Sequence, residues 1–93
     1  MQSANDDWEQ KYAEKVIMEE REYLQIRRET DPHFTPEYMR LMLNELYQSE
    51  GDGAIGKEAL NELRQASKIA AYEGFLADWE HEVAEAKKAQ ESK

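Results

Sequence analysis

Apolar side chains recur every three or four residues along most of this chain, which is the spacing of helices that bury one face. The first such stripe consists of Trp8, Tyr12, Val16, Tyr23 and Ile26. No segment alternates apolar and polar side chains over the length of a strand. The pattern therefore predicts an all-α protein.

Prolines and glycines divide this pattern into three helices. Thr35 is a suitable helix cap, and Pro36 fits the first helical position after it. Three of the four glycines fall between residues 51 and 56, which predicts a second break. We expect an up-down-up arrangement of helices over about residues 6–29, 36–49 and 57–88, with residues 1–5 disordered and residues 89–93 frayed.

The third predicted helix is long and carries an apolar seam with heptad-like spacing, formed by Ile69, Tyr72, Leu76, Trp79, Val83 and Ala86. Gly74 lies off this seam and costs about 1 kcal/mol relative to alanine, which is too little to end the helix. We therefore favour a short middle helix and one long C-terminal helix, with a bend at Gly74 left open.

The helix lengths leave apolar surface without cover. At about 1.5 Å per residue, the predicted helices are roughly 35, 20 and 50 Å long, so the middle helix covers only part of its neighbours. One solution is a homodimer in which each overhang covers the other subunit, with an interface of Trp8, Tyr12, Leu76 and Val83. The alternative is a hinge at Gly74 that folds residues 75–88 back into a four-helix monomer.

The composition limits the functions open to the chain. It has 93 residues, enough for one domain, with 21 acidic against 12 basic side chains and a formal net charge of −9. Direct nucleic-acid binding is disfavoured, because phosphate contacts need a basic patch. The absence of cysteine excludes disulfides and zinc–thiolate sites. Since no apolar run spans a membrane and residues 1–7 do not resemble a signal peptide, we expect a cytoplasmic protein.

Residues 73–85 hold five acidic side chains and no lysine or arginine. Such a one-sign helical face can steer a basic partner. We expect a non-enzymatic module, without a cofactor, that docks this face on a basic surface of a partner protein as a regulator or inhibitor. Inhibitors from phages and mobile elements, including nucleic-acid mimics, are an analogy by size and charge alone. The expected contact residues are Tyr72, Glu73, Phe75, Asp78, Trp79, Glu80, Glu82 and Glu85.

The glycine-rich break resembles the calcium-binding loop of EF-hand proteins over residues 48–59. Glu50 and Asp52 fall on two ligand positions, and Gly53 falls on the glycine of the sharp turn. Gln48 and Ala59 replace the first ligand and the bidentate glutamate of that family, so the resemblance implies millimolar calcium affinity or weaker. A weak divalent-cation binder is therefore an alternative function.

A second alternative is a structural or assembly-chaperone bundle, because residues 36–49 form the most apolar part of the chain. No catalytic arrangement stands out, since the serines have no base partner at a suitable spacing. His81 lies among carboxylates, but the pattern lacks the paired motifs of a di-iron bundle. The sequence therefore favours binding over catalysis.

Overall fold

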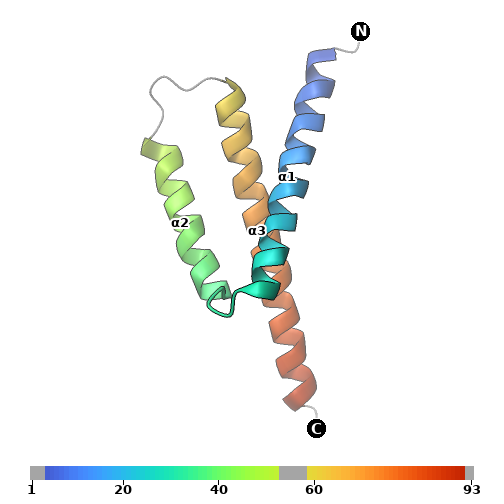
Figure 1. Cartoon of the computed structure of the whole chain (residues 1–93), viewed down its shortest axis with the longest axis vertical. Helices are drawn as coiled ribbons and strands as arrows, with labels where there is room; N and C mark the ends of the chain where they lie inside the picture. Colours follow the sequence, from blue (N-terminus) through green and yellow to red (C-terminus); the bar gives the residue numbers. More distant parts are fainter. Residues whose placement is uncertain (1–3, 53–58, 92–93) are drawn as a thin grey trace.

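The computed structural model describes the backbone of residues 4–52 and 59–91 (Figure 1). It consists of three helices, α1 (Ala4–Thr30), α2 (Pro36–Asp52) and α3 (Ala59–Glu91), and these residues contain no strand. The all-α fold, with its short middle helix and long C-terminal helix, is confirmed. α3 continues through Gly74, which confirms the favoured single long helix and rules out the alternative in which residues 75–88 fold back.

The helices extend slightly beyond their predicted ends. α1 already includes Ala4 and Asn5, which were expected to be disordered, and α3 includes residues 89–91, which were expected to fray. α2 continues past Ser49 to Asp52, so five positions of the expected 48–59 loop lie in α2, and Ala59 is the first residue of α3. The expected start of α3 at Lys57 lies outside the described residues.

α3 is the central element of the fold. It packs against both α1 and α2, whereas no Cα atom of α1 lies within 8 Å of one in α2 over the described residues. α1 and α3 run in the same direction and α2 runs in the opposite one (Figure 1). From the loop that joins them, α1 and α2 diverge, and the C-terminal end of α3 extends past that loop.

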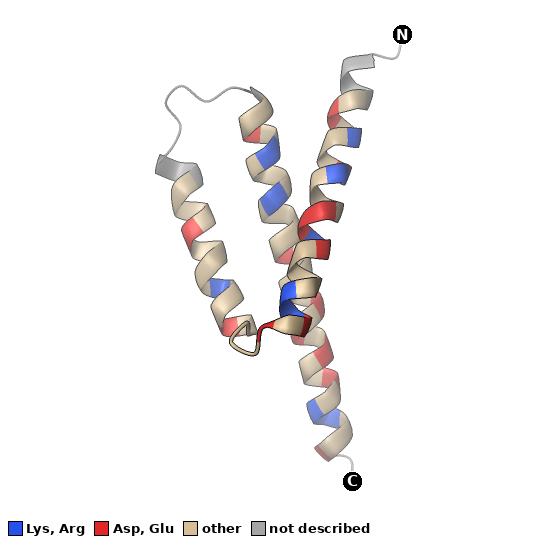
Figure 2. Ribbon diagram, viewed as in Figure 1, with Lys and Arg blue, Asp and Glu red and all other residues tan. Residues whose placement is uncertain are grey.

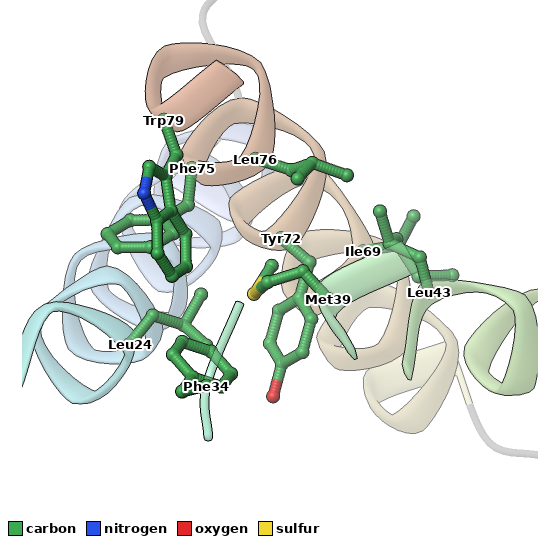
Figure 3. Packing of buried hydrophobic residues seen from close by; sticks show 9 residues of the cluster. All are labelled: Leu24, Phe34, Met39, Leu43, Ile69, Tyr72, Phe75, Leu76 and Trp79. Atoms are coloured by element: carbon green, nitrogen blue, oxygen red, sulfur yellow. The ribbon is translucent and has the colours of Figure 1, made fainter. Parts of the chain in front are cut away.

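The core forms where the three helices come together (Figure 3). α3 supplies most of it, and the other members come from α1, α2 and the first loop. The cluster consists of Leu24, Phe34, Met39, Leu43, Ile69, Tyr72, Phe75, Leu76 and Trp79. The apolar seam of α3 is therefore buried within a single chain from Ile69 to Trp79, whereas Val83 and Ala86 at its end are exposed. Leu76, predicted to lie in a dimer interface, is only 8% exposed and is a core residue instead.

A tight turn between α1 and α2 carries Phe34 into this core. The backbone N–H of His33 donates to Asp31 Oδ1 at 2.9 Å, and that bond lowers the pKa of the Asp31 carboxyl. The backbone N–H of Tyr38 donates to Thr35 Oγ1 at 3.2 Å, which confirms the predicted cap. The turn thereby fixes Phe34 with its ring centroid 5.6 Å from that of Trp79.

Replacing Phe34 by alanine should destabilise the protein by about 3–5 kcal/mol, because it removes a buried ring and leaves a cavity beside Trp79. Urea unfolding followed by tryptophan fluorescence measures this loss. Leu41 is 61% exposed and provides the control, since Leu41→Ala should change stability by less than about 0.5 kcal/mol. Equal effects of the two changes would show that the loop does not contribute to the core.

Burial also makes the stability depend on alkaline pH. Burial, assisted by the nearby Glu20 carboxylate, raises the pKa of Tyr72 from 10.0 to about 12. The folded state therefore favours the neutral phenol, and this stabilisation is complete below pH 10 and is lost as the pH rises towards 12. In urea titrations across that range, Tyr72→Phe should lose less stability than the wild type. Parallel losses would contradict the burial of this hydroxyl.

Candidate functional site

The predicted docking face on α3 is largely occupied by contacts within the chain. Arg21 Nη2 lies 2.6 Å from Asp78 Oδ2, and Arg28 Nη2 lies 2.7 Å from Glu82 Oε1. The remaining contacts pair Glu80 with Arg40 and Glu73 with the Tyr47 hydroxyl. Four of the five acidic side chains thus hold α3 to α1 or α2. Glu85 is the exception among the described residues. Figure 2 marks the acidic and basic positions along the three helices.

The aromatic residues predicted as anchors for a partner are not available on the surface. Tyr72, Phe75 and Trp79 are 4%, 5% and 8% exposed. The Arg28 guanidinium carbon lies 4.6 Å from the Trp79 ring centroid and covers that ring from solvent. The prediction that these three side chains contact a partner was wrong. A spacing of three to four residues is typical both of a helix face buried in a core and of an exposed binding face, so it could not distinguish the two.

These ion pairs contribute little to the free energy of unfolding. The acid side chains of Asp78 and Glu82 remain 66% and 58% exposed. Pairs of this kind contribute about 0–1 kcal/mol each, because water competes for both partners. Their main effect is electrostatic: each arginine cancels a charge on α3, so this face is less negative than its acid content suggests.

A more open surface lies on the other side of Arg21, between α1 and α3. It is a hollow of about 550 Å³, which we call the α1–α3 groove. Its lining consists of Glu14, Ile17, Met18, Arg21, Glu22 and Gln25 from α1 and Phe75 from α3. Ile17, Met18 and the accessible edge of Phe75 make its floor apolar, and Met18 is 59% exposed.

The rim of this groove is negative. Glu14 and Glu22 lie one helical turn before and after Met18, so both carboxylates border the apolar floor. Arg21 is the one cation in the lining, and it already pairs with Asp78. The groove therefore combines an apolar floor with carboxylates that can receive lysine or arginine side chains.

The sequence analysis did not single out this groove. Met18 lies off the apolar stripe of α1, on the side turned away from it, and was therefore not assigned to any surface. The sequence did contain one signal for it: Met18 lies off the stripe, and Glu14 and Glu22 stand four residues before and after it. Phe75 was singled out, but the sequence did not show that its ring meets α1.

The structure adds little support for the alternative of a calcium-binding loop over residues 48–59. Glu50 and Asp52 lie in the helical backbone of α2, and residues 53–58 are outside the described part of the chain. Over the described residues, no three or more histidine, aspartate or glutamate side chains are grouped to hold a metal ion.

Three residues predicted for a dimer interface retain accessible surface. Trp8 is 45% exposed and its ring lies edge-on to Tyr12, with 6.3 Å between the centroids. Tyr12 is partly exposed and Val83 is 50% exposed. They lie on different helices, α1 and α3, and nothing in the single chain covers them completely.

Among the described helices, none has the length and apolar character needed to cross a membrane. Comparison with known proteins identifies no matching family model, curated protein or solved structure. Functional inference therefore depends on the geometry of the surfaces described above.

The contact between Gly74 and Arg21 generates a prediction. A Cβ atom at Gly74 would lie 2.6 Å from Arg21 Nη1, so Gly74→Ala should displace this flexible side chain and weaken its pair with Asp78. An alanine also gains about 1 kcal/mol of helix propensity. Gly74→Ala should therefore raise the free energy of unfolding by the full amount when Arg21 is replaced by glutamine, and by less when Arg21 is present.

Thermal unfolding of the four chains in this mutant cycle gives the coupling free energy. The same gain from Gly74→Ala in both backgrounds would contradict the packing of Arg21 across Gly74.

Proposed function

We propose that this chain is a protein-interaction module that acts by binding rather than catalysis, and that it receives a basic segment of a partner protein in the α1–α3 groove. The supporting observation is the apolar floor between the carboxylates of Glu14 and Glu22, where Met18 is 59% exposed, Ile17 is partly exposed and Phe75 is nearly buried. A segment that carries one apolar anchor flanked by lysines or arginines is complementary to this arrangement.

The proposed partner is a basic protein, as expected from the sequence, but the proposed contact surface is the α1–α3 groove instead of the acidic face of α3. The formal net charge of −9 steers a basic partner towards the molecule at long range. Close contact then occurs where carboxylates are not held in an ion pair and where apolar surface is accessible. The α1–α3 groove satisfies both conditions better than the face of α3, whose acids are paired.

A regulatory or inhibitory role follows from this mode of binding. A module that occupies a basic segment blocks whatever that segment otherwise binds, including nucleic acid. This role, like a cytoplasmic location, remains part of the proposal. Cation binding at residues 48–59 and a chaperone role of α2 stay predictions from sequence, since no contact among the described residues favours them over the groove.

The experiment uses a synthetic helical peptide of leucine and lysine, with leucines on one face, as the probe. Titration into the ¹⁵N-labelled chain should shift the amide signals around Ile17, Met18 and Phe75 most strongly. Glu14→Lys combined with Glu22→Lys should weaken binding at least about tenfold, which corresponds to about 1.4 kcal/mol. Met18→Ser should weaken it without changing charge.

The matched control combines Glu37→Lys with Glu62→Lys, which makes the same change in net charge on exposed positions outside the groove. This variant should bind the peptide nearly as well as the wild type. If both double variants lose affinity equally, or if signal shifts follow the acids over the whole surface, binding depends on net charge alone and the proposed groove is wrong.

A further inference from the structure

One basic side chain of the chain itself already lies in the α1–α3 groove. Arg21 extends from α1 to the surface of α3, where its Nη2 lies 2.6 Å from Asp78 Oδ2. Its guanidinium carbon lies 6.0 Å from the Phe75 ring centroid, which is the outer limit of a cation–π contact. The groove therefore already holds the kind of charged group that the proposed partner would bring to it.

Gly74 makes room for this guanidinium on α3. A Cβ atom at Gly74 would lie 2.6 Å from Arg21 Nη1, so the guanidinium lies directly against the helix at this position. Phe75 and Asp78 follow Gly74 by one and four residues, which places ring, backbone and carboxylate within about one turn of α3. We call these three residues, Gly74, Phe75 and Asp78, the guanidinium subsite of the groove.

Arg21 is held more loosely than the other two arginines of α1 that contact aromatic rings. The guanidinium carbon of Arg27 lies 4.7 Å from the Phe34 ring centroid, and that of Arg28 lies 4.6 Å from the Trp79 ring centroid. The side chains of Arg27 and Arg28 are 26% and 27% exposed, whereas that of Arg21 is 38% exposed. Moving Arg21 into solvent therefore sacrifices the least contact.

We infer that the guanidinium subsite receives an arginine of the partner segment, and that Arg21 occupies it until the partner binds. This inference rests on the proposed function, since the same groove receives the partner. Arginine fits the subsite because its planar group can pair with the Asp78 carboxylate and lie against the Phe75 ring. The ammonium of lysine is a compact charge that has no planar surface to stack on a ring.

The resident arginine makes the groove weaker and more selective. When the partner's arginine displaces Arg21, one ion pair replaces another, so Asp78 adds little to the net affinity of the wild type. Glu14, Glu22 and the apolar anchor supply the remaining contacts. A segment that carries only lysines does not restore the contact with Phe75 and leaves Arg21 in place. The partner is thereby narrowed from a basic segment to one that carries arginine beside its apolar anchor.

The first test compares the leucine–lysine peptide with a leucine–arginine peptide of the same pattern, by calorimetric titration into the full chain. Arg21→Gln should raise the affinity for the leucine–arginine peptide about threefold to fivefold, because an exposed ion pair of this kind becomes available to the peptide. The affinity for the leucine–lysine peptide should rise less. Thermal unfolding should show that the variant remains folded.

Arg64→Gln is the matched control, because it removes the same charge from an exposed position of α3 outside the groove. It should change the affinity for either peptide by less than about twofold, since charges far from the groove act only through screened long-range attraction. An equal rise in affinity from Arg21→Gln and Arg64→Gln would overturn the inference.

The decisive measurement adds Asp78→Asn to the wild type and to the Arg21→Gln chain. Asp78→Asn should have little effect on peptide affinity while Arg21 is present, and should cancel the gain for the leucine–arginine peptide once Arg21 is replaced. Long-range charge effects are additive and give no such coupling. If the peptides bind at the groove but the two effects add, the inference alone is wrong. If neither peptide binds at the groove, the proposed function fails and the inference fails with it.

Discussion

The fold depends on burying one face of α3 against both α1 and α2, whose Cα atoms all lie more than 8 Å from each other over the described residues. Tyr72, Phe75, Leu76 and Trp79 are all nearly inaccessible, and they lie within two turns of one helix. α1 contributes Leu24 to this core and α2 contributes Met39, both with no exposed surface. Because α3 is the shared partner, its central turns hold the molecule together (Figure 3). Residues 81–91 at its C-terminal end are exposed.

This arrangement determines where acidic side chains remain accessible. Arginines that cover the buried aromatics also reach the neighbouring acids: Arg28 lies over Trp79 and pairs with Glu82. Arg21 lies near the Phe75 ring and pairs with Asp78. The central part of α3 is thereby neutralised, and unpaired carboxylates remain beside the α1–α3 groove. The contacts of these two arginines thus cover the core and also neutralise the acids of α3, so that the unpaired carboxylates lie beside the α1–α3 groove.

Much of the fold was predictable from the sequence because local signals agree with the global structure. The cap at Thr35 correctly predicted the start of α2, and the small penalty of Gly74 correctly predicted that α3 is continuous. Both signals depend only on residues close by in the sequence. The end of α2 was less predictable: Gly51 and Asp52 suggested a loop, yet the helix continues through them. The propensity penalty of one glycine, about 1 kcal/mol, is too small to end a helix by itself.

The candidate site was less predictable because it depends on which helix packs where. Helical periodicity identified Trp79 as important but not what covers it, and Phe34 gave no periodic signal because it lies in a turn. Likewise, counting charges along residues 73–85 could not reveal the arginines supplied by α1 and α2. Sequence distance separates Arg28 from Glu82 by 54 positions, so only the packed structure brings them together.

The central claim is that the aromatic face of α3 is core within a single chain. Acrylamide quenching of the Trp8→Phe variant, in which Trp79 is the remaining tryptophan, tests it most directly. The account predicts blue-shifted emission and slow quenching that persist at dilutions where only monomer is present. Fast quenching with red-shifted emission in the monomer would show that Trp79 is exposed and would contradict the account.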